Sequence, residues 1–446
     1  MTRGAANGAG HRRLRSWLQP GVGIKRWLLL VLLGELLLAL AAAVFVRQAS
    51  RDLAPGTPAA WLLDLVSLQF LPVWLRPIVL LTAGGLAFVV GIWRLMRAVL
   101  EPYAAPDESL AELVYQKRWR ARGPRIVAIG GGTGLSVLLR GLKEVTSNIT
   151  AVVTVADDGG SSGRLRDELG LPPMGDIRRC IAALADAEPA MADLMAYRFP
   201  ENGHDTAYDG HAFGNLLIAA LTDVAGGDFE EAVRRANRVL AVRGKVVPAA
   251  AVPLTLHAEL ADGTAMEGQA AIARARGVKR VWITPADVDA AAEAIEAIAS
   301  ADLVVLGPGS LYTSIMPSLL VPGLRRALAE TPAPRLFVSN VATQVGETEG
   351  YTLADHLAAF AAHDLADLVD GVLVNDNFHA RVPANYPTVP VRIDAAQLTG
   401  DGPPVFPRDV VDDDNAHHHD SHKLAAAIGA LHQRRLIKRR PVAVAA

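Results

Sequence analysis

The sequence is poor in cysteine, in aromatic residues and in net charge. It has one cysteine, Cys180, among 446 residues, which excludes an intramolecular disulfide and is typical of a protein from a reducing compartment. Cys180 lies in an apolar helical run, so we interpret it as a buried, unreactive thiol. Aromatic residues make up 5% of the chain and the formal charge is -2. The chain as a whole therefore has no basic excess that would attract nucleic acid, and no nucleic-acid partner is expected.

The common nucleotide-binding and catalytic patterns are also missing. After Gly130 and Gly132, the third glycine of G-x-G-x-x-G would fall at Leu135, and no G-K-[ST] follows. The sequence contains neither a G-x-S-x-G elbow nor an H-E-x-x-H helix. These absences argue against a dehydrogenase and leave the catalytic residues, if there are any, unassigned.

Two apolar segments stand out near the N-terminus. Residues 27–46 are long enough to cross a bilayer and contain one charge, Glu35. Residues 77–96 have a shorter uncharged part, flanked by Arg76 and Arg94, whose side chains can snorkel. We interpret residues 27–100 as a two-helix transmembrane hairpin rather than a cleaved signal peptide. Glu35 is interpreted as a tolerated or oligomer-facing group rather than a functional intramembrane acid.

Arginine and lysine are concentrated outside the two apolar segments. Six precede the first segment, six lie between the end of the uncharged part of the second segment and residue 123, Arg94 being the first of them, and three lie between the two segments. The positive-inside rule therefore predicts a multi-pass cell-membrane protein whose basic N-terminal segment, residues 1–26, and main domain are both cytoplasmic.

After a polar linker, residues 101–123, apolar strand-like runs alternate with amphipathic helical ones. We assign this domain to residues 124–438, followed by a tail, residues 439–446. Seven runs are expected to form strands: residues 125–130, 149–156, 278–284, 301–307, 335–340, 370–375 and 389–394. Their continuous apolar character predicts an α/β fold with a doubly wound, mostly parallel, Rossmann-like sheet. Residues 254–272 break the rhythm and predict an inserted β-hairpin that turns at Asp262 and Gly263.

Three loops rich in glycine and serine each follow an expected strand. They are "GGTG" at Gly131–Gly134, "DDGGSSGR" at Asp157–Arg164 and "GPGS" at Gly307–Ser310. The start of a helix after such a loop offers backbone N–H groups and a helix dipole to an anion. Because the three strands belong to one sheet, the loops are expected to converge on one rim and to bind a ligand that contains a diphosphate.

Acidic and basic groups accompany the second loop. Asp157 and Asp158 occupy the place where doubly wound folds commonly hold a ribose hydroxyl, although capping of amides in their own loop is the alternative. Other polar groups close to expected helix starts are Asp176, Arg178, Arg179, His211 and Asn215. For His211, a structural role and a ligand contact stay equally open.

In this order the motifs resemble the gluconeogenesis factor family, relatives of 2-phospho-L-lactate transferase, from about Arg125 to about Leu436. The resemblance rests on "GGGTGLSVLLRGLK", "ITAVVTVADDGGSSGRLR", "GDIRRC", "GHAFGNLLIAAL", "LGPGSLYTSIMPSLLVPG" and "NVATQVGETEGYTLADH". It implies a doubly wound fold, a nucleotide-sugar ligand, typically UDP-N-acetylglucosamine, and a role in carbon flux to the cell wall and in cell shape.

The resemblance also implies which residues bind the ligand. They are Gly131, Gly132, Thr133 and Gly134; Asp157, Asp158, Gly159, Gly160, Ser161, Ser162, Gly163 and Arg164; Asp176 and Asn215; Gly307, Pro308, Gly309 and Ser310; and Tyr386 in "NYPTVPVRID". The chain departs from the family pattern at Arg179, Val345 and His418, where relatives usually carry asparagine, proline and arginine. Taken alone, His417, His418, His419 and His422 suggest adventitious metal binding or a flexible tail rather than a specific metal site.

Two classes of function fit this sequence. The first is a membrane-held regulator, expected to be a homo-oligomer, that senses a nucleotide sugar and passes the signal to a protein partner in cell-wall regulation. The second is a transferase that moves a phospho-group from a nucleotide diphosphate donor to an acceptor alcohol. In the transferase, Asp157, Asp158 or Asp176 would hold Mg²⁺, and no other cofactor is expected.

Overall fold

The computed structural model divides the chain into two compact units, Met1–Trp119 and Arg120–Ala446. It describes isolated positions between residues 35 and 68 and the stretches 70–100, 119–185, 189–200, 208–382, 388–393 and 402–439. The predicted boundaries of the linker and of the tail fall largely outside these stretches and stay predictions.

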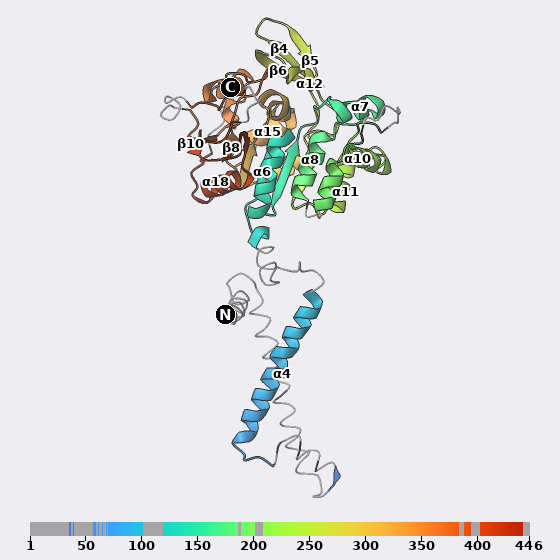
Figure 1. Ribbon diagram of the computed structural model, residues 1–446, viewed down its shortest axis with the longest axis vertical. Helices are drawn as coiled ribbons and strands as arrows, with labels where there is room; N and C mark the ends of the chain where they lie inside the picture. The colour runs from blue at the N-terminus through green and yellow to red at the C-terminus, as the bar shows by residue number, and fades with distance from the viewer. Residues whose placement is uncertain are drawn as a thin grey trace. The chain divides into compact units, whose positions relative to one another are not determined.

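One long apolar helix, α4 (Leu75–Leu100), dominates what is described of the first unit (Figure 1). It covers the predicted span at residues 77–96, and its part Leu75–Arg94 is long and apolar enough to cross a membrane. Large side chains along it, such as Leu81 and Leu86, are exposed within the unit, as a lipid-facing helix requires. It is the one such helix among the described residues. Most of the other predicted span, residues 27–46, lies outside them, so the two-helix hairpin stays a prediction.

The second unit is built on a seven-stranded parallel sheet. Its strands are β1 (Ile126–Gly130), β2 (Ile149–Val153), β3 (Lys245–Pro248), β7 (Leu303–Leu306), β8 (Arg335–Val338), β9 (Gly371–Asn375) and β10 (Val405–Arg408). They are ordered β10-β9-β8-β7-β1-β2-β3 and every neighbouring pair is parallel. The chain thus starts in the middle of the sheet, runs to one edge, and returns to build the other half. This order confirms the doubly wound prediction and places the switch point between β1 and β7.

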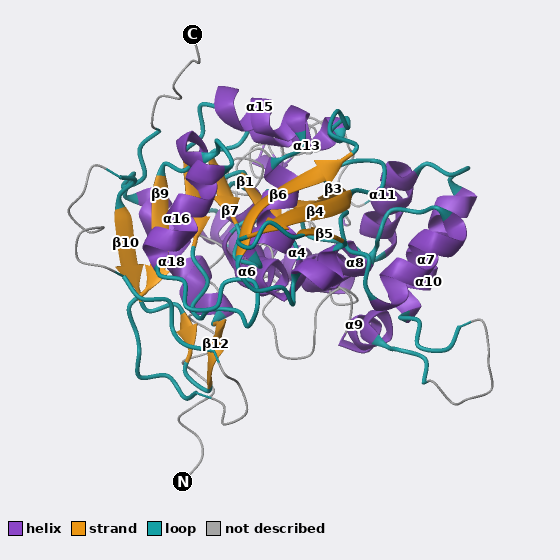
Figure 2. Cartoon of the chain, turned by 90° about the horizontal axis from the view of Figure 1, so that it is seen from above, coloured by secondary structure: helices purple, strands orange, loops and turns teal. Residues whose placement is uncertain are grey.

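Helices cover both faces of this sheet. Figure 2 shows α13 (Ala292–Ala299) and α15 (Pro322–Glu330) on one side, and α6 (Gly132–Val145) and α18 (Ser421–Gln433) on the other. The central strands are buried at every residue of β1, β7, β8 and β9, which explains their continuous apolar sequence. The remaining helices are α7 (Gly160–Leu169), α8 (Gly175–Leu184), α9 (Pro189–Ala196), α10 (Phe213–Val224), α11 (Phe229–Val239), α12 (Gln269–Ile272), η2 (Leu311–Ile315), α14 (Met316–Leu319), α16 (Leu353–Ala362) and η3 (Ala366–Leu368).

The predicted insertion forms a small antiparallel sheet beside α12 (Figure 1). Strands β4 (Thr255–Leu260) and β5 (Ala265–Glu267) make the expected hairpin, whose turn contains Gly263 at φ 86°. The prediction was wrong for residues 278–284, which form β6 (Val278–Thr284) and pair antiparallel with β4 instead of joining the parallel sheet. Within β6 the side chains of Val281 and Ile283 are buried while that of Trp282 is exposed. This alternation is typical of a sheet covered on one face only.

Residues 389–394 were also expected to form a strand. The described part of this segment makes one isolated bridge, between Pro390 and Ala342, and no strand. The sheet instead gains β3 and β10, which the apolar pattern did not reveal. Pro248 ends β3, and Pro407 lies within β10 at the sheet edge, where a missing N–H is tolerated.

A short antiparallel pair, β11 (Val411–Asp412) and β12 (Asn415–His419), follows β10 and leads into α18. Asp420 caps α18 by accepting hydrogen bonds from the N–H groups of His422 and Lys423, both at 2.8 Å. The interpretation of the histidine run as a flexible tail was therefore wrong, because His417–His419 form a strand that packs into the domain.

Candidate functional site

Two glycine loops meet at the switch point of the sheet. The first connects β1 to α6, and the second follows β7. They lie so close that a Cβ on Gly134 would be 2.8 Å from the backbone oxygen of Pro308. Gly132, the first residue of α6, has φ +68°, a conformation that side chains disfavour, and a Cβ there would meet only Ser314 Oγ at 3.7 Å. The start of α6 therefore borders open space at the place where doubly wound folds bind ligands.

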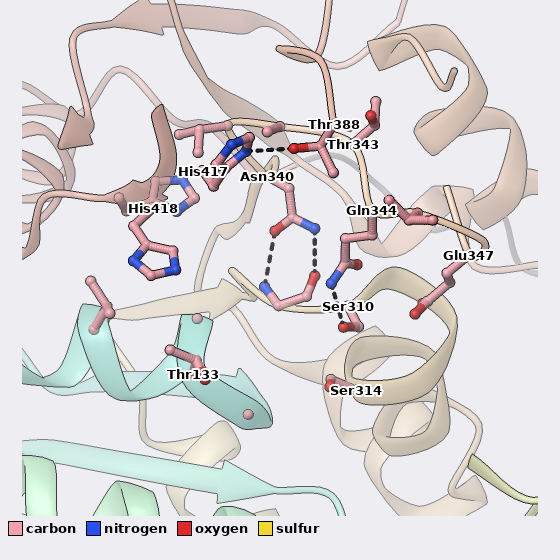
Figure 3. Close-up of a pocket in the computed structure, with 18 of the residues that line it drawn as sticks. Thr133, Ser310, Ser314, Asn340, Thr343, Gln344, Glu347, Thr388, His417 and His418 are labelled. Carbon is pink, nitrogen blue, oxygen red and sulfur yellow. Dashed lines mark hydrogen bonds between the residues drawn. The ribbon is translucent and has the colours of Figure 1, made fainter. Parts of the chain in front are cut away.

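A cavity of about 630 Å³ opens over these loops. Its floor contains Gly131–Gly134, Gly309, Ser310 and Ser314, and its walls come from residues 340–347, Thr388, and 415–419. Figure 3 shows Asn340, Gln344, Thr388 and His417 projecting from several different elements toward this space. Most polar groups around the cavity are amides, hydroxyls and imidazoles, so the cavity suits a ligand with many hydrogen-bonding groups.

Asn340 and Gln344 hold the second glycine loop in place. Asn340 Nδ2 donates to the carbonyl oxygen of Gly309 at 3.0 Å, and its Oδ1 accepts from the N–H of the same residue at 3.3 Å. Gln344 Nε2 donates to Ser310 Oγ at 2.8 Å (Figure 3). The other amide atom of Gln344, Oε1, is buried without a hydrogen-bond partner among the described residues. The loop after β7 is thus fixed by the segment that follows β8.

A buried carboxylate, Glu347, caps the π-helix η2. Its Oε1 accepts from the backbone N–H groups of Tyr312 at 2.6 Å and Thr313 at 3.1 Å, and its Oε2 accepts from Thr313 Oγ1 at 3.0 Å. Burial raises the pKa of Glu347 to about 7, against the opposing effect of these hydrogen bonds. Single-turn π-helices occur frequently at functional sites. Here the cap puts a carboxyl group that titrates near neutral pH in the cavity wall.

The histidines of β12 form another part of this wall. His417 Nδ1 lies 2.5 Å from Thr388 Oγ1, and His419 Nε2 lies 3.2 Å from the backbone oxygen of Ser339. Burial lowers the pKa of His419 to about 4, so its imidazole is neutral at physiological pH. His418 also lines the cavity. In the described parts of the chain, no group of three or more His, Cys, Asp or Glu side chains is arranged to hold a metal ion.

A smaller cavity of about 420 Å³ adjoins the first one. The two share Gly132, Thr133, Ala273, Ser310 and Ser314 in their linings. The smaller one extends toward the second predicted loop, at the starts of α7 and α8. Its charged lining residues are Asp157, Asp176, Arg178, Arg179 and Arg198.

The acids of this region have different surroundings. Asp157 Oδ1 accepts from the N–H of Gly159 within its own loop at 3.0 Å. Asp158 turns toward the insertion, where its Oδ1 accepts from the N–H of Ala270 at 2.8 Å. Asp176 is buried and pairs with Arg179 Nη1 at 2.7 Å. Burial raises the pKa of Asp176, and the nearby Asp157 carboxylate raises it further, whereas Arg179 opposes the shift.

Ser161 and His211 form a buried pair. The distance from Ser161 Oγ to His211 Nδ1 is 3.1 Å, and the same hydroxyl accepts from the N–H of Ala212 at 3.2 Å and from Asn215 Nδ2 at 3.0 Å. Because two donors already point at the oxygen, the hydroxyl proton is directed to His211. Burial and the nearby Arg164 lower the pKa of His211. This network gives His211 a structural role in holding the second loop against α10.

The structure brings most of the predicted binding residues together. Those that line one or both cavities are Gly131, Gly132, Thr133, Gly134, Asp157, Gly159, Gly160, Ser161, Ser162, Asp176, Asn215, Gly309 and Ser310. Four other predicted binding residues line neither cavity: Asp158, Gly163, Gly307 and Pro308. Arg164 is exposed and donates to the backbone oxygen of Asp209 at 2.7 Å. Tyr386 lies outside the described residues.

Sequence reasoning missed the walls of the larger cavity. Asn340, Gln344 and Glu347 follow β8 directly, and the rule that singled out the first three loops, polar residues after a buried strand, would have found them. Thr388 and the β12 residues carry no such signal, because they come from a segment without a long apolar strand.

The comparisons agree with this doubly wound architecture. The model of the family described as 2-phospho-L-lactate transferase CofD matches residues 126–411. A relative from Nostoc sp. is 48% identical over 374 residues, which cover 80% of this chain and 78% of that protein. The gluconeogenesis factor of Bacillus subtilis is 46% identical over 311 residues, 68% of this chain and 97% of its own.

A solved structure matches the second unit. The crystal structure of a UPF0052 family member from Bacillus halodurans has a TM-score of 0.64 and 42% sequence identity, and the match covers 69% of this chain and 99% of that one. The chain belongs to the gluconeogenesis factor family, within the wider CofD family, as its motifs indicated. The three residues that depart from the family pattern lie in different cavities. Arg179 lines the smaller cavity, whereas Val345 and His418 line the larger one.

Proposed function

We propose that this protein binds a nucleotide sugar, with UDP-N-acetylglucosamine as the first candidate, and regulates carbon flux to the cell wall and cell shape. The observation that carries the proposal is the meeting of two glycine loops at the switch point, under a cavity of about 630 Å³. The start of α6 lines this cavity and offers a helix dipole and the backbone N–H groups beyond Gly132 to a diphosphate. Around the larger cavity, Gln344 Oε1 is buried without a hydrogen-bond partner among the described residues, so it is available to accept from a donor group of a base or a sugar.

We further propose that the N-terminal segments anchor the protein in the membrane. Helix α4 supports one span, and the arginine and lysine asymmetry supports a second span at residues 27–46 with both ends of the chain in the cytoplasm. A cytoplasmic domain held at the membrane would meet its nucleotide-sugar ligand where cell-wall precursors are consumed, and would pass the signal to a protein partner there.

The second candidate is a transferase of the 2-phospho-L-lactate transferase type. It is favoured by Asp157 and Asp176, which line the smaller cavity beside the proposed diphosphate position. One or two carboxylates with phosphate oxygens are what Mg²⁺ usually requires. Asp158 fits this role less well, because its carboxylate already accepts from the amide of Ala270.

Calorimetric titration of the full-length chain in detergent would test ligand binding. We expect UDP-N-acetylglucosamine to bind at a ratio of one per chain, and GDP and ADP to bind at least tenfold more weakly. Absence of binding by any nucleotide sugar would refute the proposal. Incubation with a labelled nucleotide diphosphate donor, Mg²⁺ and cell lysate separates the two functions, since turnover indicates the transferase and stoichiometric retention indicates the regulator.

A further inference from the structure

The smaller cavity contains a buried cation, Arg178, for which the described stretches provide no ion-pair partner. The side chain of Arg178 is among the buried charged groups. Its Nε donates to Asn215 Oδ1 at 3.1 Å and its Nη1 donates to the backbone oxygen of Met195 at 2.9 Å. Both acceptors are neutral, and Arg178 makes no ion pair with any residue that the structure describes. A buried cation is costly unless it is paired, so this arrangement favours an anion in the cavity.

Two further arginines line the same cavity. Arg198 Nη1 donates to the backbone oxygen of Gly210 at 2.5 Å, and Arg179 pairs with Asp176. Burial and, to a smaller extent, the positive charges of Arg179 and Arg198 lower the pKa of Arg178 to about 10, against the opposing effect of Asp176. Both guanidinium groups therefore lie close enough to Arg178 to repel it, and an anion among them would relieve that repulsion.

The carboxylates in the cavity do not remove this excess of positive charge. Three arginines face two aspartates, Asp157 and Asp176. The buried Asp176 is already engaged by Arg179 and by the backbone N–H of Gly132. In addition, α7 and α8 begin with Gly160 and Gly175 in the lining, so that two helix dipoles favour an anion there, while the N–H of Gly175 itself donates to Ser162 Oγ at 3.0 Å.

The larger cavity has a different character. Glu347 is its only acidic lining residue, and no arginine or lysine lines it in the described stretches. The two cavities are joined through Gly132, Thr133, Ala273, Ser310 and Ser314. A single connected cleft thus has one neutral half and one cationic half, and the two halves suit different chemical groups.

We infer that the cationic half is a separate binding site for a small phosphate monoester, occupied together with the nucleotide sugar in the other half. A tetrahedral dianion offers enough acceptor oxygens for three guanidinium groups and two helix N-termini, more than a single carboxylate does. The volume of about 420 Å³ accommodates a small phosphorylated metabolite. This inference rests on the proposed function and adds a second ligand to it. The protein would then respond to the concentrations of both the nucleotide sugar and a second, phosphorylated metabolite.

The test uses calorimetry on the full-length chain in detergent, at constant ionic strength, with inorganic phosphate as the probe. We expect phosphate to bind in the presence of saturating UDP-N-acetylglucosamine with less than a threefold change in affinity, and malonate to bind more weakly than phosphate. Competition between phosphate and the nucleotide sugar would overturn the inference, because the diphosphate of the nucleotide would then occupy the arginines. Tighter binding of malonate would overturn the assignment to a phosphate ester.

Arginine variants connect the binding to this cavity. Arg179→Gln and Arg198→Gln should each weaken phosphate binding at least tenfold and change the affinity for the nucleotide sugar less than twofold. Arg238→Gln is the matched control, because Arg238 is also an ion-paired helix arginine, with Glu231 at 3.0 Å, but lines neither cavity. Unchanged phosphate affinity in both cavity variants would overturn the inference. Arginine-dependent phosphate binding without any nucleotide-sugar binding would instead support this site and refute the proposed function.

Discussion

Asn340 and Gly309 are joined by two hydrogen bonds between the side-chain amide of one and the backbone of the other. Such a pair fixes both the position and the orientation of the peptide at Gly309. Asn340 follows β8 and Gly309 follows β7, so the bonds tie the ends of two neighbouring strands together at the floor of the larger cavity. The loop is therefore held in a binding geometry by the protein itself.

Replacement of Asn340 by alanine should weaken ligand binding more than it weakens the fold. Loss of the two bonds frees the Gly309 peptide, and we expect the affinity for UDP-N-acetylglucosamine to fall about tenfold, corresponding to roughly 1 to 1.5 kcal/mol for such bonds. Calorimetry measures the affinity. Asn237→Ala is the control, because Asn237 makes the same kind of double contact with the backbone of Val246, away from both cavities. Equal losses of affinity in the two variants would contradict this role.

Glu347 should make stability depend on pH in the near-neutral range. Its pKa of about 7 in the folded protein lies above the ordinary value of 4.5, so the native state holds this proton more tightly than the unfolded chain does. The free energy of unfolding should therefore fall as pH rises from about 4.5 to 7, and then level off. A shift of this size corresponds to about 3 kcal/mol.

The variant Glu347→Gln isolates this contribution, because glutamine keeps the shape and does not titrate. Urea unfolding at several pH values should show wild-type stability falling relative to the variant between pH 5 and 7. Parallel curves for the two proteins across this range would show that Glu347 does not titrate there.

The buried pair of Arg335 and Asp370 should be the most sensitive ion pair to single substitution. Both side chains are fully buried, and three nitrogen atoms of Arg335 donate to Asp370 at 2.8 Å. Asp370→Asn leaves an uncompensated buried cation, so we expect a loss of about 3 to 5 kcal/mol in urea unfolding. The exposed pair of Arg125 and Asp302 provides the comparison, and Asp302→Asn should cost much less. A similar cost for both substitutions would refute the argument.

A side chain at Gly132 should affect binding through backbone geometry. Gly132→Ala meets no close neighbour but forces φ +68° on a non-glycine residue, which costs roughly 1 to 2 kcal/mol of stability. The new methyl group also projects into the shared part of the two cavities, so the affinity for the nucleotide sugar should fall by more than this. Calorimetry and urea unfolding of the same protein give the two numbers. A loss of stability with unchanged affinity would mean that the loop is only a turn.

Substituted-cysteine labelling in intact cells tests the membrane topology. A cysteine at Thr57 should react with an impermeant thiol reagent, whereas cysteines at Ala5 and Ala445 should not. The native Cys180 is fully buried, and burial raises the pKa of its thiol, so it should contribute little background. Reaction at Ala5 or Ala445 would overturn the two-span arrangement.

The centre of the fold was predictable and its edges were not. Strands β1, β2, β7, β8 and β9 are largely buried, so their sequences are almost continuously apolar. Such apolar runs can be recognised in the sequence without knowledge of the structure. β3 and β10 each contain a proline and lie at the sheet edges, where fewer neighbours constrain the composition. β6 was assigned to the wrong sheet because its length and β-branched residues suit either kind, and only its alternating burial distinguishes them.

The candidate site was also predictable only in part. The glycine loops could be found because a backbone that must turn sharply and approach a ligand needs glycine. Asn415 and His417 could not be found, since an ordinary polar residue lines a cavity only when distant parts of the chain bring it there. Arg178 was visible as a base near a helix start, but its burial depends on packing against Met195 and Asn215, which no local pattern shows.

Helix α18 lies against α6, so closely that a Cβ on Gly141 would be 1.9 Å from the backbone oxygen of Ser421. The strand just before α18 supplies the histidine wall of the larger cavity. During synthesis, a ribosome therefore releases both glycine loops long before it releases the residues that complete the pocket. A chain interrupted after β10 would contain every strand of the main sheet and still lack that wall. A ligand that contacts the histidine wall can therefore make those contacts only after translation has passed β12.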